Sequence, residues 1–181
     1  MVSPITCDEL LQRLDGLGIS YSFHRHPATP TVKEGIAFRK TMPGVHCKNL
    51  FLRDTKKRYW LITMPIERHV NLKELPALIG STRLSFAQPQ RLMEKLGVEP
   101  GSVTPFAVVH DQDTSVSVIL DDEMMRQPLL NVHPLVNTAT IGVSPQDLLR
   151  FILSCGHKPC MVDFGPISDS LDFPHSETVS A

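Results

Sequence analysis

The sequence lacks the features that mark membrane, secreted and disulfide-rich proteins. No apolar run approaches the ~18 residues that span a bilayer, and the first residues have neither the basic start nor the apolar block of a secretory signal. The four cysteines form no CxxC pair and no cluster with zinc spacing, so we expect free thiols. These absences predict a cytoplasmic protein.

Several catalytic signatures are also missing from the chain. It contains no GxSxG elbow, no Walker loop and no glycine-rich dinucleotide turn. The eight histidines show no recognisable ligand spacing. We therefore expect no metal and no cofactor, and the commonest nucleophilic and nucleotide-dependent enzymes are not supported.

The charge balance excludes a basic field over the whole chain. The formal net charge is -1, so a nucleic acid could be attracted only by a local patch. The candidate patches are Arg39 with Lys40, and residues 53–58 (RDTKKR), which include Arg53. The alternative interpretation is that both are solvated turns.

What is present has the composition of one ordinary globular domain. The chain has 181 residues, of which 41% are hydrophobic and 20% are charged, enough to bury one core. We expect a single domain over residues 1–164. Residues 165–181 are poor in core-forming periodicity and are expected to form a flexible tail.

Capping and periodicity signals predict interleaved helices and strands. The expected helices begin near Thr6, Thr31, Asn71, Pro89 and Ser144. The expected strands are residues 21–26, 46–54, 59–65, 83–87, 104–111, 115–122, 131–143 and 158–164. The hairpin over 46–65 and the three late strands do not fit a strict βαβ repeat, so the prediction is a mixed α/β (α+β) sheet with helices packed outside it.

Three segments place polar groups where a site could form. Lys48 lies within a predicted strand, where an unpaired ammonium is hard to bury and must reach solvent, a partner or a ligand. The loop GSVTPF combines freedom at Gly101 with the fixed φ of Pro105 and could leave backbone N–H groups unused. His133 interrupts the apolar segment NVHPLVNTATIG. The ordinary alternatives are a lysine that snorkels to water, a plain loop and a core strand with polar interruptions.

The order of these segments resembles a known family. HCKNLFLRD, YWLITMP, RLSFA, LGVEPGSVTPF, VILDDEM and NVHPLVNTATIGVSPQDLLRFILSCGHKP together are similar to the YbaK and prolyl-tRNA synthetase-associated family of aminoacyl-tRNA editing domains. The most similar branch is that of the free-standing alanyl-tRNA(Pro) deacylases. The resemblance covers residues 5–164.

The resemblance implies a fold and a reaction. The fold would be a mixed, curved, partly barrel-like sheet holding a small pocket. The reaction would be hydrolysis of the ester of a mischarged tRNA(Pro), without metal or nucleotide, with the tRNA(Pro) acceptor end and prolyl-tRNA synthetase as expected partners. Alanine is the expected amino acid. The alternatives are a cysteinyl-tRNA(Pro) deacylase and a non-catalytic tRNA-binding module of the same fold.

The resemblance also implies roles for individual residues. Lys48 matches the functional lysine of the family and is the expected catalytic residue. Arg83, together with Arg53 of the basic patch, is expected to bind tRNA. The expected substrate-binding residues are Asn49, Gly101, Ser102, Val103, Thr104, Pro105 and His133. The plausible walls of the amino-acid pocket are Val103, Phe106, Leu135 and Ala139.

Overall fold

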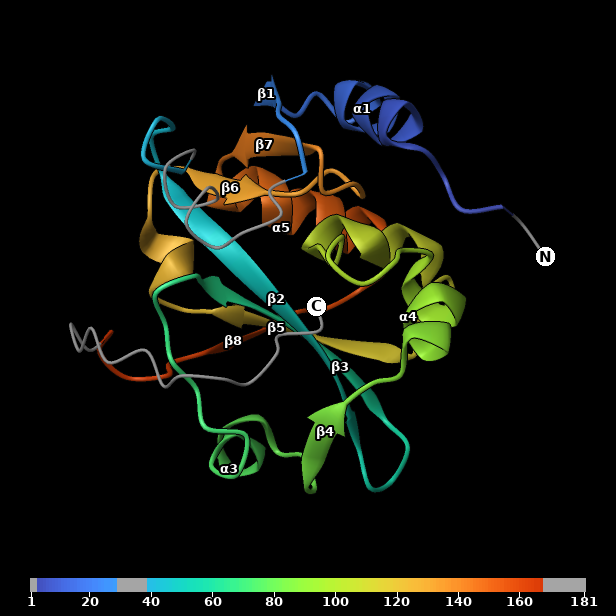
Figure 1. Cartoon of the computed structure of the whole chain (residues 1–181), viewed down its shortest axis with the longest axis vertical. Coiled ribbons are helices and arrows are strands. Elements are labelled where there is room, and N and C mark those ends of the chain that lie inside the picture. Colours follow the sequence, from blue (N-terminus) through green and yellow to red (C-terminus); the bar gives the residue numbers. More distant parts are fainter. Residues whose placement is uncertain (1–2, 29–38, 168–181) are drawn as a thin grey trace.

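A computed structural model describes residues 3–28 and 39–167 (Figure 1). The helices are α1 (Cys7–Gly16), α3 (Leu75–Ile79), α4 (Pro89–Leu96) and α5 (Pro145–Ser154), with the 3-10 helices η1 (Pro105–His110) and η2 (Met124–Arg126). The strands are β1 (Tyr21–Arg25), β2 (Val45–Asp54), β3 (Tyr59–Pro65), β4 (Leu84–Phe86), β5 (Val116–Asp121), β6 (Leu130–Val132), β7 (Ala139–Val143) and β8 (Cys160–Val162). None of the helices in these ranges is both long and apolar enough to cross a bilayer.

The eight strands form one mixed sheet in the order β1-β7-β6-β2-β3-β5-β8, and β4 adds to β2. The pairs β2–β6, β3–β5 and β5–β8 are parallel, whereas the hairpins β2–β3 and β6–β7 are antiparallel. Figure 1 shows β2 running diagonally through the centre, with α1 and α5 above it and α3 below. The predicted mixed α/β class is therefore confirmed.

Alternation along the central hairpin gives the sheet two apolar faces. Phe51 and Leu61 enter the larger core cluster, whereas Leu52 and Ile62 enter a smaller one with Leu75 of α3. Successive side chains of a strand point to opposite faces of the sheet, so other elements must pack on each face to bury its apolar side chains. The larger cluster is closed by the helices α1, α4 and α5, and the smaller by α3.

Helix ends with local sequence signals lie where they were predicted. Thr6 and Glu9 form the capping box of α1, which ends at Gly16. Ser144 caps α5 by accepting from the Asp147 N–H at 3.1 Å. Each cap satisfies helix N–H groups that have no partner inside the helix.

Two predicted strands are wrong as elements. Residues 104–111 form the 3-10 helix η1 instead, because Thr104 caps it and Pro105 starts it with a helical φ. Residues 131–143 are not one strand but the end of β6 and the whole of β7, joined by a turn in which Leu135 has φ +67°.

Of two further predicted helices, one begins later than expected and the other lies outside the described residues. The one expected from Asn71 begins only at Leu75, because the Asn71 side chain accepts from the Lys73 N–H in a preceding turn. The helix predicted from Thr31 lies outside the described residues, as does most of the predicted tail. The four cysteines are free thiols, as expected.

The start of β2 depends on a glycine. Gly44 has φ +95°, and a Cβ there would lie 2.8 Å from the Leu129 carbonyl oxygen, which accepts from the Val45 N–H. We expect Gly44→Ala to destabilise the fold by about 2 to 5 kcal/mol, from left-handed strain plus overpacking. Gly80→Ala is the control, since that residue has φ +70° but open space around it. Equal losses in urea unfolding would contradict the expectation.

Candidate active site

A gap in strand pairing marks the middle of β2. Its first residues pair with β6 up to His46, and its last pair with β4 from Leu52 onward. Among the described residues, β3 is the only strand that pairs with residues 47–51. Within this stretch, a side chain of β2 binds the segment 101–104.

Asn49 makes that connection. Its Nδ2 donates to the Val103 carbonyl at 2.9 Å, and its Oδ1 accepts from the Thr63 hydroxyl at 2.8 Å. Both ends of the amide are therefore engaged, which fixes its orientation and that of the loop. Asn49 was predicted to bind substrate, and its contacts in the structure position the loop 101–104.

A second hydrogen bond that fixes the loop is made by its own residue Thr104. Its hydroxyl donates to the His133 carbonyl at 2.6 Å, which links the loop to the turn between β6 and β7. The loop begins with Gly101 at φ +86°. Ser102 donates its N–H to Glu99, whereas no acceptor within the described part of the chain receives the N–H of Val103 or Thr104. Unpaired N–H groups in a half-buried loop are uncommon and can serve a ligand oxygen.

His133 lies against this loop in a defined tautomer. Its Nδ1 lies 3.0 Å from the Ala139 carbonyl oxygen, which can only accept, so in the neutral ring Nδ1 carries the proton and Nε2 is an acceptor. Burial lowers the pKa of His133. The ring of His26 lies 6.3 Å away, centroid to centroid, and His26 contacts Thr140. The His133 ring is thus held as a neutral imidazole by Ala139, and the backbone carbonyl of the same residue binds Thr104 of the loop.

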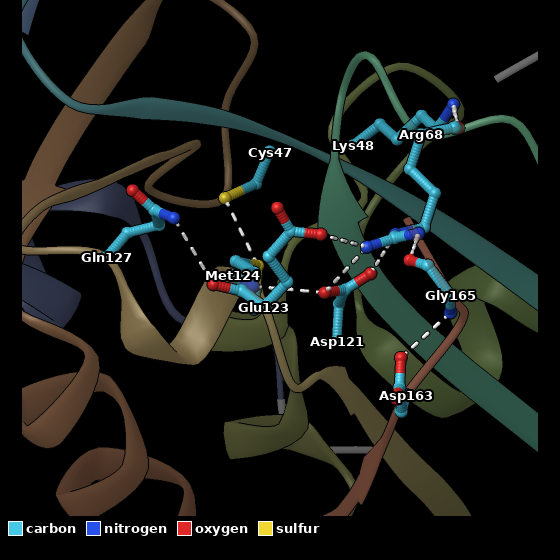
Figure 2. A network of polar contacts seen from close by, with 9 residues as sticks. All are labelled: Cys47, Lys48, Arg68, Asp121, Glu123, Met124, Gln127, Asp163 and Gly165. Atoms are coloured by element: carbon cyan, nitrogen blue, oxygen red, sulfur yellow. Dashed lines mark hydrogen bonds and ion pairs between the residues drawn. The ribbon is translucent and has the colours of Figure 1, made fainter. Parts of the chain in front are cut away.

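Lys48 points to the other face of β2. Its ammonium donates to the Arg68 carbonyl, and Figure 2 shows it leaving the strand in the direction opposite to Cys47. Burial lowers the pKa of Lys48, the Arg68 charge lowers it further, and Glu67 opposes them. Lys48 therefore neighbours Asn49 along the strand, but within the described part of the chain its ammonium has no hydrogen bond to the loop 101–104 or to His133.

The two predicted tRNA-binding arginines lie toward the other end of β2. Arg53 pairs in register with Tyr59 and Ser85, and Arg83 is exposed just before β4. Arg53 lies five positions after Lys48 along the strand, about 16 Å at ~3.3 Å per residue.

A surface hollow of about 480 Å³ lies elsewhere, along β5 and the segment after α5, and none of the predicted site residues lines it.

Burial makes other candidate groups unsuited to catalysis. Burial raises the pKa of the Cys47 thiol, whose sulfur lies 3.5 Å from that of Met124, so this thiol is a poor nucleophile.

No three His, Cys, Asp or Glu residues within the described ranges are placed to share a metal ion. The predicted pocket walls Phe106, Leu135 and Ala139 are buried, and Val103 is half-buried.

Sequence reasoning missed the residues around the Lys48 ammonium. Arg68 follows β3 in a polar stretch, IERHV, that reads as an ordinary loop, yet it is one of the largest fully buried side chains. Its partner Asp121 ends β5. The sequence contained one signal for a buried ion pair, namely the carboxylate at the end of the apolar run VILDD.

Comparisons with known proteins show the family and the fold of the chain. Residues 26–151 match the model of the aminoacyl-tRNA editing domain. The chain is 39% identical over 160 residues to the prolyl-tRNA synthetase associated domain-containing protein 1 of Bos taurus, covering 86% of this chain and 93% of the bovine protein. It is 34% identical over 149 residues to the prolyl-tRNA editing protein ProX of Acetoanaerobium sticklandii, covering 82% and 91%. A solved structure of a proposed trans-editing enzyme for prolyl-tRNA synthetase has the same fold, with a TM-score of 0.65 and 23% identity over 91% of this chain and all of that one.

The Asn49 amide is expected to determine the position of the loop 101–104. Asn49→Asp replaces the donor facing the Val103 carbonyl with an acceptor, so we expect a loss of about 1 to 3 kcal/mol and shifted NMR signals in the loop. Thr63→Val is the control, because it removes one partner of Asn49 but leaves the bond to Val103. Loop signals unchanged in Asn49→Asp would show that another contact positions the loop.

The stability of the fold is expected to fall as the pH drops from about 7.5 to 5. Burial lowers the pKa of His46, His110 and His133, so below about 6.5 the unfolded chain binds more protons than the folded one. Protonating His110 would also break the bond in which its Nε2 accepts from the Ile5 N–H at 2.9 Å.

Thermal unfolding across this pH range tests the expectation, with His110→Gln as the comparison. The variant is expected to lose less stability per pH unit than the native protein. An equally steep decline in both would exclude His110 as a contributor.

Proposed function

The chain belongs to the aminoacyl-tRNA editing domain family, and we propose that it is a trans-editing deacylase that hydrolyses the ester of mischarged tRNA(Pro), with alanine as the amino acid removed. The observation that carries the proposal is the loop 101–104, which is bound by Asn49 of β2 and by the His133 carbonyl and has two N–H groups unpaired within the described chain. Its expected partners are the acceptor end of tRNA(Pro) and prolyl-tRNA synthetase, which supplies the mischarged product, in the cytoplasm.

The chemistry of an ester suits these groups. Water attacks the ester carbonyl, whose oxygen becomes an oxyanion in the tetrahedral intermediate and needs donors at that position. The N–H groups of Val103 and Thr104 can donate to it. His133 Nε2 can accept the proton of the attacking water and return it to the ribose oxygen that leaves. A neutral imidazole is required for this step, which agrees with the lowered pKa of His133.

The charged residues are assigned to the tRNA. Lys48 would bind a phosphate near the terminal adenosine, since its ammonium makes one hydrogen bond in the described chain and has further donors. Arg53 and Arg83, toward the other end of β2, would contact the acceptor stem further from the ester. Such contacts supply affinity and register.

The amino acid would be selected by volume. The wall residues Phe106, Leu135 and Ala139 are buried, and Leu135 lies in a turn with a left-handed backbone, so this wall is stiff. A rigid ring such as that of proline would overpack a small site at a cost of about 1 to 3 kcal/mol. A side chain smaller than proline would fit, and cysteine is therefore the competing substrate.

A direct assay decides between these possibilities. Purified protein is incubated with alanyl-, cysteinyl- and prolyl-tRNA(Pro), and loss of the ester is followed under single-turnover conditions. We expect the alanyl ester to be hydrolysed fastest and the prolyl ester to survive. Faster loss of the cysteinyl ester would overturn the assignment to alanine, and binding without hydrolysis would leave a tRNA-binding module.

Lys48→Ala is expected to lower the deacylation rate by roughly a hundredfold or more while the melting temperature changes little, because its ammonium bonds one backbone carbonyl. Lys158→Ala, an exposed lysine after α5, is the control and should retain full activity. Unfolding of the Lys48 variant would mean that the residue is structural.

A further inference from the structure

Arg68 is a buried cation with an unusual set of partners. Its side chain is 2% exposed and forms ion pairs with Asp121, at the end of β5, and with Glu123 at 2.8 Å (Figure 2). An arginine is rarely buried so completely unless its donors are matched by acceptors. The position of the guanidinium is therefore fixed by β5 and the turn that follows it.

The C-terminal segment completes the enclosure of Arg68. Nη1 donates to the Gly165 carbonyl at 2.6 Å, and the guanidinium lies 5.8 Å from the centre of the Phe164 ring. The Gly165 N–H in turn donates to the Asp163 side chain at 2.8 Å. The arginine is thus held from two directions, by acids on one side and by the chain after β8 on the other.

The backbone carbonyl of Arg68 binds the side chain of Lys48. The Arg68 N–H donates to the Pro65 carbonyl at 3.0 Å in a tight turn, and the Arg68 carbonyl accepts from the Lys48 ammonium. We infer that Arg68, anchored by Asp121, is a positioning residue for Lys48: the buried ion pair holds the carbonyl that orients the ammonium. This role rests on the proposed function, in which Lys48 serves the aminoacyl end.

Stability alone is a weak reason to keep such a pair. Replacing a buried ion pair by apolar residues of similar volume is often neutral or stabilising. The benefit must then lie in what the pair holds in place, and the carbonyl bound by Lys48 is one such group. If the turn were loose, the exposed carboxylate of Glu67, whose charge acts on Lys48, would compete for the ammonium.

The test compares two buried carboxylates on the central sheet. Asp121→Asn keeps the oxygen that accepts from the Met124 N–H but weakens the pair with Arg68. Asp54→Asn is the matched control: Asp54 is buried on β2, is paired with Arg58 at 2.7 Å and lies six residues from Lys48. Both variants should lower the melting temperature.

Only Asp121→Asn is expected to lower the deacylation kcat, by roughly tenfold or more, with KM for the tRNA changed by about twofold at most. In a Lys48→Met background the same substitution should reduce kcat no further, because its effect passes through Lys48. An equal loss of kcat in Asp54→Asn, or an undiminished loss in the Lys48→Met background, would overturn the inference.

A measurement without tRNA separates this inference from the proposed function. With lysines labelled at 13Cε, the Lys48 signal and its titration midpoint are followed by NMR in the free protein. Asp121→Asn should shift both, and Asp54→Asn should shift neither. An unmoved Lys48 signal in Asp121→Asn refutes the positioning role whatever the activity, whereas a shift in a protein that hydrolyses no ester refutes the proposed function alone.

Discussion

The backbone of a central strand needs partners along both of its edges, and within the described part of the chain one edge of β2 is paired with strands only at its two ends. That constraint organises the site. Within the gap at residues 47–51, the Asn49 side chain holds the loop 101–104. Since a loop does not consume every N–H in a ladder, donors remain available beside a strand that is otherwise rigid.

The two faces of β2 divide the polar groups of the site between them. Asn49 reaches the loop 101–104 and, through Thr104, His133, whereas the ammonium of Lys48 binds the turn after β3. Burial has the same effect on both sides: it lowers the pKa of His133 and that of Lys48. A neutral imidazole and a partly buried ammonium thus belong to the two faces of one strand and to the segments that bind it.

Signals that act over a few residues were readable in the sequence, and those that depend on distant partners were not. The caps at Thr6 and Ser144 and the hairpin β2–β3 follow from neighbouring residues. Residues 104–111 were mistaken for a strand because a short apolar run has no period that separates a strand from a 3-10 helix. The burial of Arg68 was invisible, since its acceptors lie 53 to 97 positions further along the chain.

The distance in sequence between Arg68 and its acceptors determines how late their contacts can form during synthesis on the ribosome. The Arg68 carbonyl that accepts from Lys48 is made early, whereas the Gly165 oxygen that accepts from the Arg68 guanidinium is added 97 residues later. A nascent chain that has completed β2 and β3 still carries an unshielded guanidinium at the turn. The surroundings of the Lys48 ammonium are therefore complete only after residue 165 has been added.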